Sequence, residues 1–267
     1  MDAVLWSALA APGKITNIWG RSGAGKTSLA LGISLREIQD ANGKVLYITD
    51  DPESVAALLS MLYQVDGARS GQATWIAEGF ILINSPTFKN LGQIIQQIQF
   101  AFLPDEVIRA SAEFKSFVGA GENDINEKVI ESLKAYKSPS MVIIDEVTRQ
   151  FKRQLIDAED PGPAILQLVT QLGFLKNIAV EKRIKLVLTS ANRTIMTAVG
   201  GADETRFIDV PLASDVFDHY VDIDVQVQWT PRAGERNIII TGSNEKNKQL
   251  QVVISIETLH KRLARGV

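Results

Sequence analysis

The chain has 267 residues, which is enough to bury a large core, and we expect one domain over residues 1–267. Cysteine is absent, which excludes disulfides and thiol chemistry and suits the reducing cytoplasm. The formal net charge of -3 gives no overall attraction for a polyanion, so nucleic-acid binding would depend on local basic segments. No run of about twenty apolar residues is present, so no membrane span is expected.

Short apolar runs along the first two thirds of the chain predict buried strands at 14–20, 43–51, 79–85, 138–150 and 185–192. Between them, apolar residues spaced three or four apart predict helices that begin near Thr27 and Pro52, fill much of 90–137, and cover 163–183. The residues expected to face the core are Leu91, Ile94, Ile95 and Ile98 in the third helical segment, and Ile165, Leu168, Leu172, Leu175 and Ala179 in the last.

After residue 219 the apolar period changes to two, which predicts antiparallel strands near the C-terminal end. Alternation of strands and helices over the earlier part predicts a parallel sheet that is covered on both faces. The sequence therefore predicts an α/β fold with a mainly parallel β-sheet flanked by helices and extended by C-terminal antiparallel strands.

The segment GRSGAGKTS has the spacing of a phosphate-binding loop: Gly20, four residues, Gly25, Lys26 and Thr27. Glycines allow successive backbone N–H groups to turn toward phosphate oxygens, and the following helix adds its positive dipole end. Lys26 is expected to contact the β and γ phosphates of ATP, and the Thr27 hydroxyl to coordinate Mg²⁺. The residues expected to bind the nucleotide are Gly20, Arg21, Ser22, Gly23, Ala24, Gly25, Lys26, Thr27 and Ser28. The simpler alternative, a glycine-rich turn with a chance lysine, does not account for the preceding strand and following helix.

Acidic residues follow two of the predicted strands. Asp145 ends the apolar run MVIID and is expected to hold Mg²⁺ through a water, as a Walker B aspartate does. The carboxylates available to orient a hydrolytic water are Glu146, Asp50, Asp51 and Glu53. Asp51 also precedes Pro52 and is a natural helix N-cap, while Glu53 would complement the helix dipole. The residues alone leave this choice open.

In this order, the motifs are similar to the RecA-type ATPase core and, within it, to archaeal RadA recombinases and their paralogues of the RadB and RadC type. The segments that carry the resemblance are GRSGAGKTSLALGI, VLYITDD, MVIIDEVTRQFKR, LVLTSAN and VGGADETRF, followed by DHYVDIDVQV, GERNIIITGSN and QVVISIETL. They cover 14 to about 88 and 138 to about 259. RadA recombinases carry a helical domain before this core, so the short segment ahead of Gly20 implies a core-only paralogue. Residues 89–137 exceed the corresponding family region and are expected to form a helical insertion.

The resemblance also assigns roles to site residues. It places the family's catalytic carboxylate on Asp51, where RadA-like proteins usually carry glutamate, and its polar sensor on residues 190–192. Walker B is normally followed by serine in this family, whereas this chain has Glu146. Because an aspartate at 51 reaches less far than a glutamate, we favour Glu146 as the residue that activates water, with Asp51 and Lys26 as further catalytic residues.

Two segments match the family's DNA-binding loops in position, at 149–162 and 193–210. The residues expected to contact DNA are Arg149, Lys152 and Arg153 in the first segment and Arg193, Arg206 and Phe207 in the second. Arginine on flexible backbone, with an apolar side chain against a base, suits single-stranded DNA. The alternatives are a solvated helix face for the basic residues and a core anchor for Phe207.

The resemblance implies a Mg²⁺-dependent ATPase that binds single-stranded DNA and modulates homologous recombination, with a recombinase or other repair proteins as partners. RecA-type sites commonly lie between subunits, so a homo-oligomer is one expectation, with Lys246 and Lys248 as weak candidates for a cation supplied in trans. VLYITDDPES is also close to the KaiC-like family, so the alternative is a nucleotide-dependent switch or scaffold that acts on protein partners. A third alternative is a protein that binds ATP without turnover.

Overall fold

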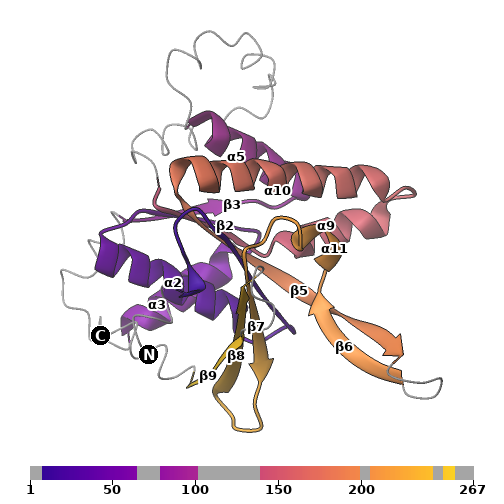
Figure 1. Cartoon of the computed structure of the whole chain (residues 1–267). Coiled ribbons are helices and arrows are strands. Elements are labelled where there is room, and N and C mark those ends of the chain that lie inside the picture. Colours follow the sequence, from indigo (N-terminus) through magenta and orange to yellow (C-terminus); the bar gives the residue numbers. More distant parts are fainter. Residues whose placement is uncertain (1–7, 65–78, 102–138, 199–204, 243–248, 256–267) are drawn as a thin grey trace, which may run out of the picture.

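The structure is a computed structural model that describes residues 8–64, 79–101, 139–198, 205–242 and 249–255. Strands and helices alternate along most of the chain (Figure 1). In chain order they are β1 (Ile15–Gly20), α2 (Lys26–Ala41), β2 (Val45–Thr49), α3 (Pro52–Gln64), β3 (Phe80–Asn84), α5 (Phe88–Ala101), β4 (Met141–Asp145), α9 (Val147–Asp157), α10 (Gly162–Lys182), β5 (Lys185–Ala198), β6 (Thr205–Pro211), α11 (Ser214–Phe217), β7 (Ile223–Trp229), β8 (Glu235–Gly242) and β9 (Gln249–Ser255).

The strands form a nine-stranded sheet in the order β3-β2-β4-β5-β1-β7-β8-β9, with β6 paired to β5. Every pairing from β3 to β7 is parallel, whereas β7–β8, β8–β9 and β5–β6 are antiparallel. The central strands are buried along their whole length, as expected when helices cover both faces. The predicted α/β class is therefore confirmed, including the antiparallel strands near the C-terminal end.

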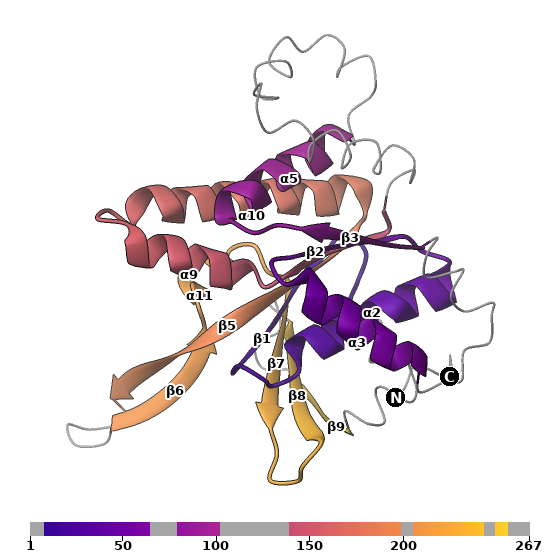
Figure 2. The same ribbon diagram turned by 180° about the vertical axis from the view of Figure 1, so that it is seen from behind.

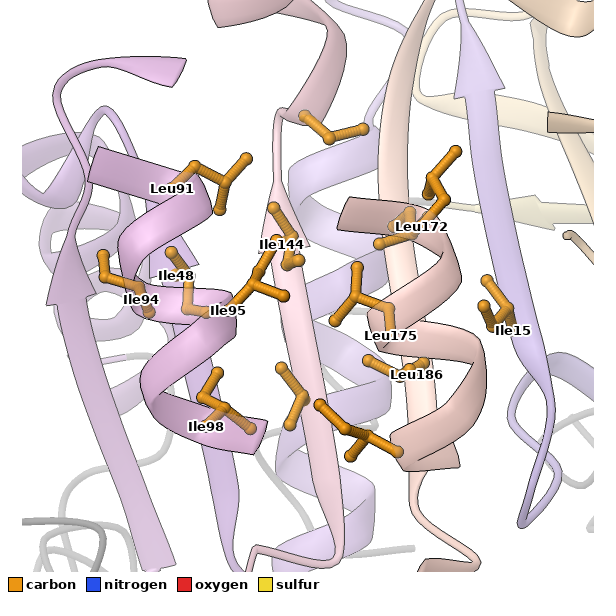
Figure 3. Close-up of a cluster of buried hydrophobic side chains, with 14 of the residues drawn as sticks. Ile15, Ile48, Leu91, Ile94, Ile95, Ile98, Ile144, Leu172, Leu175 and Leu186 are labelled. Carbon is orange, nitrogen blue, oxygen red and sulfur yellow. The ribbon is translucent and has the colours of Figure 1, made fainter. Parts of the chain in front are cut away.

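Helices α5, α9, α10 and α11 cover one face of the sheet. Their apolar side chains pack against every second residue of the strands, such as Ile15, Ile48 and Ile144 (Figure 3). The four residues predicted to face the core from α5 are all buried there. In α10 the prediction was wrong for Ile165, which is 40% exposed, because the helix turns Ala164 inward instead.

Helices α2 and α3 cover the opposite face, as the two views of the molecule show (Figures 1 and 2). The core on this side combines their side chains with those of β2, β4, β7 and β8, including Leu31, Tyr47, Ile143 and Val225. The sheet is therefore packed between two hydrophobic layers, one on each face. Because β1, β2 and β4 run parallel within it, their carboxyl ends lie along one edge of the sheet.

The chain leaves β4 earlier than predicted. The strand expected over 138–150 ends at Asp145, and α9 begins at Val147. Val147 and Phe151, four residues apart, are both buried, and Leu155 packs against the same core cluster. This spacing is that of an amphipathic helix. The first segment assigned to a DNA-binding loop is therefore largely helical.

The second such segment contains a β-hairpin. Strand β5 continues to Ala198, beyond the sheet, and pairs with β6 in the register Asn192↔Pro211 to Ala198↔Thr205. Figures 1 and 2 both show this pair projecting away from the body of the molecule. Cross-strand pairing accounts for the extended conformation, which an assignment as a loop missed.

Two further expectations concern helices. Most of the predicted insertion at 89–137 lies outside the described residues, and only α5 belongs to them. By length and composition alone, α10 is a helix that could cross a membrane. It packs on the sheet, however, with Leu168, Leu172 and Leu175 buried, so it is a core helix and gives no clear indication of a membrane span.

Candidate functional site

The turn between β1 and α2 follows a path that requires glycine. Gly20 has φ 154°, and a Cβ there would lie 2.3 Å from the carbonyl oxygen of Val227 in β7. Gly23 and Gly25 also have positive φ, 71° and 100°. Such conformations are costly for residues with a side chain. The glycines of the motif therefore allow the loop to turn tightly against β7.

The start of α2 presents backbone N–H groups without helical partners. The first α-helical hydrogen bond runs from Leu29 N to Gly25 O, at 2.9 Å. The N–H groups of Gly25, Lys26 and Thr27 precede this bond, as the first amides of a helix do. Together with the helix dipole they form a site suited to an anion.

Lys26 is the first residue of α2, and its ammonium contacts the turn that precedes the helix. The residue is 7% exposed, and Nζ donates to Gly20 O at 3.1 Å and to Arg21 O at 3.4 Å. The same ammonium lies 3.7 Å from Oε2 of Glu146. Lys26 and Glu146, the acid that follows Asp145, are therefore neighbours in space.

Arg21 extends out of the loop toward the β5–β6 hairpin. Its Nε donates to Oδ2 of Asp209 in β6 at 2.9 Å, and Thr194 donates to the other oxygen at 2.7 Å. These hydrogen bonds, that of Thr194 above all, lower the pKa of Asp209 below its usual value. A cavity of about 230 Å³ lies beside this contact, lined in part by Trp19 and Gln226. The loop and the hairpin are thus connected by a direct ion pair.

Asp145 is held at the end of β4 by two buried hydroxyls. It is 5% exposed and accepts hydrogen bonds from Tyr47, at 2.8 Å, and from Thr189. Burial, with a contribution from Asp145, raises the pKa of Tyr47 well above its usual value, so the phenol remains a donor. This support orients the carboxylate at the edge of the sheet where the loop lies.

The residues predicted to hold magnesium have the donor atoms that this ion prefers. The predicted protein ligands are the Thr27 hydroxyl and the Asp145 carboxylate, both hard oxygen donors. Among the described residues no group of three or more Asp, Glu and His side chains could enclose a metal. Mg²⁺ is commonly bound by one or two carboxylates together with waters and substrate phosphates, so this sparse donor set suits it.

Glu146 is the acid that the structure brings closest to the loop lysine. Besides Lys26, its carboxylate accepts a hydrogen bond from Thr148 at 3.3 Å and lies 3.7 Å from Nη2 of Arg149. Thr148 in turn accepts a hydrogen bond from the backbone N–H of Ala191 in β5, at 2.7 Å. Glu146 is therefore oriented by two side chains, and one of them also contacts the strand that leads into the hairpin.

The other candidate acids have different surroundings. Asp51 accepts a hydrogen bond from Ser54 N at 3.1 Å, as the N-cap of α3 does. Hydrogen bonds from the Ser54 side chain and then from its backbone N–H lower the pKa of the Asp51 carboxyl. Asp50 is paired with Arg149, at 3.1 Å, and Arg153, at 3.7 Å. Burial raises the pKa of Asp50 above its usual value, and the two arginines only partly offset this. Glu53 is exposed in the first turn of α3.

The residues predicted to contact DNA are dispersed. Arg149 and Arg153 both face Asp50, while Lys152 is exposed on α9. Arg193 lies in β5 and donates to Ser214 and Asp215, each at 3.3 Å. The register places Arg206 opposite Thr197 and Phe207 opposite Met196 in the hairpin. Lys246 and Lys248 lie outside the described residues.

The predicted polar sensor at 190–192 divides between two environments. Ser190 is fully buried and donates to Asn17 at 2.8 Å, within the sheet. Asn192 lines the cavity beside the loop. Ala191 contributes only its backbone N–H, to Thr148.

Four residues of the site were missed from the sequence. They are Tyr47 and Thr148, which orient the acids, and Trp229 and Arg236, which contact the loop from β7 and β8. Thr148 lies two residues from Glu146, so the sequence carries a local signal for that contact. Tyr47 and Asp145 are 98 residues apart, so no local signal indicates theirs. Arg236 and Ala24, its hydrogen-bond partner, are 212 residues apart, and no local pattern indicates that contact.

Comparison with known proteins identifies the fold. No protein-family model matches the chain, and none of the curated protein sequences matches it. The structure is similar to one described as the crystal structure of the RadB recombinase, with a TM-score of 0.58 over 93% of this chain and 91% of that one. The two sequences are 17% identical, so the similarity concerns the fold. The chain therefore shares the fold of that structure, which agrees with the RecA-type core expected from the sequence.

Proposed function

We propose that this protein binds ATP with Mg²⁺ at residues 20–28, hydrolyses it, and acts on single-stranded DNA in homologous recombination. The observation that carries the nucleotide assignment is the pairing of Lys26 with Glu146 beside the glycine loop, at 3.7 Å. A cation for the phosphates and a carboxylate for the attacking water are the two charges that phosphoryl transfer requires at this place. The protein's proposed place of action is the cytoplasm.

Each side chain has a defined task in this proposal. The N–H groups at the start of α2 bind the phosphates, and Lys26 moves from the carbonyls of Gly20 and Arg21 to the phosphate oxygens. Thr27 and Asp145 would hold Mg²⁺, which supplies positive charge opposite the phosphates when bound. Glu146 orients the water, with Thr148 and Arg149 holding its carboxylate. Asp51 is assigned to capping α3, so Glu146 is preferred over Asp51 as the residue that activates water.

The hydrolytic part is tested by phosphate release from Mg-ATP, with Glu146→Gln and Asp51→Asn as paired variants. Loss of a positioned general base lowers turnover by about 10²- to 10⁴-fold, and we expect a loss of that size for Glu146→Gln only. Both variants should bind ATP as the unmodified chain does, because neither side chain belongs to the loop. Equal turnover in all three proteins would remove the assignment of Glu146. Absence of turnover in the unmodified chain, with binding retained, would favour the alternative of a protein that binds ATP only.

Support for DNA binding comes from the β5–β6 hairpin. This hairpin projects from the body of the molecule (Figure 1). It carries Arg193, which was predicted to contact DNA, and Met196, which is 70% exposed. An exposed apolar side chain near arginine suits stacking against bases and contact with phosphates. The structural similarity to a protein described as a recombinase supports the proposal that DNA is a partner. We also propose other recombination proteins, or further copies of this chain, as protein partners.

The DNA part is tested by anisotropy of a labelled oligothymidylate over a salt series. We expect binding that weakens with salt, and a logarithmic slope about 0.7 smaller in Arg193→Ala, which removes one phosphate contact. Lys182→Ala is the matched control, because it also removes one positive charge. Lys182 ends α10, close to the start of β5, whereas Arg193 lies in the later part of β5 that pairs with β6. Identical slopes for the two variants would contradict a DNA contact through Arg193.

A second candidate function is a nucleotide-dependent switch that acts on protein partners, as in KaiC-like proteins. It is favoured by one observation: Arg149 and Arg153, two of the cations proposed for DNA, face the carboxylate of Asp50. This pairing reduces the charge that α9 offers to phosphates. If the unmodified chain shows no salt-sensitive affinity for single-stranded DNA but still binds ATP, the switch becomes the better reading.

A further inference from the structure

An arginine of β8, Arg236, contacts the proposed nucleotide loop. Neither the sequence motif nor the proposed mechanism assigns it a role. Arg236 is the second residue of β8, is 7% exposed, and donates from Nε to the carbonyl oxygen of Ala24 at 2.8 Å. Its Nη1 donates to the carbonyl of Glu235 at 2.7 Å. The guanidinium carbon lies 3.7 Å from the ring centre of Trp229, a cation–π contact. The side chain is thus held on three sides and aimed at the loop.

The hydrogen bond to Ala24 determines how one peptide of the loop is oriented. In a trans peptide the carbonyl of one residue and the N–H of the next point in opposite directions. A carbonyl of Ala24 held toward Arg236 therefore directs the N–H of Gly25 away from β8. It also keeps the carbonyl oxygen, which would repel a phosphate, on the side facing β8. Because Gly25 has φ 100° and little steric restraint of its own, this peptide needs an external contact to keep one orientation.

Two neighbouring contacts support the same part of the loop. The carbonyl oxygen of Val227 occupies the space that a Cβ on Gly20 would fill, at 2.3 Å. Carbon Cζ2 of Trp229 lies 3.4 Å from the position of a Cβ on Gly23. The β7–β8 hairpin therefore contacts the loop at its beginning, middle and end.

The charge of Arg236 is also uncompensated within the part of the chain that the structure describes. No carboxylate there lies within 4.0 Å of its guanidinium, whose acceptors are carbonyl oxygens and an aromatic ring. Buried cations are normally paired with an anion, since burial without one is costly. An anion bound in the loop that Arg236 contacts through Ala24 would supply such a partner.

We propose that Arg236 is a positioning residue that orients the Ala24–Gly25 peptide and supplies positive charge for a bound polyphosphate. This inference rests on the proposed function, because it concerns the same loop. Arg236 itself acts through Ala24 and is not assigned a contact with the reacting atoms.

The test compares Arg236→Met, Arg236→Lys and Arg232→Ala. Methionine keeps much of the volume and removes the donor and the charge, while lysine keeps both and loses the planar stacking on Trp229. Arg232 is an exposed arginine in the turn of the same hairpin, paired with Glu235 at 3.8 Å, and serves as the control. Affinity is measured with a fluorescent ATP analogue, and circular dichroism confirms that each variant is folded at the temperature used.

Loss of a hydrogen bond to a charged group predicts an affinity about 10- to 100-fold weaker in Arg236→Met. Arg236→Lys should lie between that variant and the unmodified chain, and Arg232→Ala should match the unmodified chain. Partial rescue by lysine separates positioning of the loop from simple loss of packing. Equal affinities for all four folded proteins would overturn the inference.

A second measurement requires no nucleotide. Amide hydrogen exchange of segment 20–28 should be faster in Arg236→Met and Arg236→Lys than in Arg232→Ala, because the loop loses its support. If Arg236→Met does not fold, exchange and affinity in Arg236→Lys decide the question. If the unmodified chain binds no ATP analogue, the proposed function fails, whereas faster loop exchange would still support the positioning role. Unchanged exchange in both Arg236 variants would reject that role whether or not ATP binds.

Discussion

Replacing Gly20 by alanine tests the backbone path of the loop directly. The added Cβ would lie 2.3 Å from the Val227 carbonyl oxygen, a distance that real Cβ contacts essentially never show. The φ of 154° adds strain of its own, about 1–3 kcal/mol for a conformation that almost only glycine adopts. Moving backbone to relieve an overlap costs about 1–3 kcal/mol more. The variant should therefore lose about 2–6 kcal/mol, divided between stability and nucleotide affinity.

Alanine substitutions at two further glycines separate the loss of stability from the loss of nucleotide affinity. Gly234, in the turn between β7 and β8, has φ 79° and no atom near the position of a Cβ, so Gly234→Ala carries strain without an overlap. Gly242 has neither feature, so Gly242→Ala should leave the protein unchanged. Thermal unfolding gives the stability of each variant, and titration with a fluorescent ATP analogue gives the dissociation constant.

We expect Gly234→Ala to lower stability and leave affinity unchanged, because its strain lies outside the loop. Gly20→Ala should weaken binding by about 30-fold or more if as little as 2 kcal/mol is expressed there. Equal affinity and equal stability of Gly20→Ala and Gly234→Ala would refute the close approach of the loop to β7.

Three more predictions concern side chains around the site and the core. Asp51→Ala removes the N-cap of α3 and should cost about 1 kcal/mol in thermal unfolding while ATP turnover persists; loss of turnover at unchanged stability would contradict the capping role. Thr148→Val removes the hydroxyl between Glu146 and Ala191, so turnover should fall while ATP affinity stays constant, and unaltered turnover would show that Glu146 needs no such support. Burial alone would raise the pKa of Asp222, but hydrogen bonds from Lys176 and its other partners lower it below the usual value, so it stabilises the fold above about pH 4 and loses that contribution as pH falls through the lowered pKa. In acid unfolding, Asp222→Asn should therefore show less loss of stability below about pH 4 than the unmodified chain, and parallel curves would be the contrary result.

The parallel sheet and its covering helices were predictable because their signals are local. Runs such as VLYIT and MVIID are apolar on both faces, and only a strand covered on two sides tolerates this. The glycine loop was equally clear, since its spacing reflects backbone geometry that few other structures need. Even so, the inward face of α10 was placed wrongly at Ile165, because its neighbour Ala164 also fits the core.

The remaining features depend on contacts between distant segments. Nothing within β8 indicates that Arg236 meets Ala24, since the two residues come together only when β1 and β8 flank β7. The segment after Asp145 was expected to be a loop because it matches a DNA-binding loop of the RadA family in position, whereas burial of Val147 and Phe151 one helical turn apart makes it a helix in this chain. The sequence offered two roles for Asp51, helix N-cap and catalytic carboxylate, and did not distinguish them. The hydrogen bond from Ser54 N to Asp51, which the structure shows, supports the capping role.

The central claim is that residues 20–28 bind the phosphates of ATP. Calorimetric titration of Mg-ATP into the unmodified chain and into Lys26→Ala tests it most directly, because Lys26 lies inside the loop and contacts Gly20, Arg21 and Glu146. The account predicts one ATP per unmodified chain and binding at least tenfold weaker in the variant, provided that both are folded. No binding to the unmodified chain, or equal binding to both proteins, would contradict it.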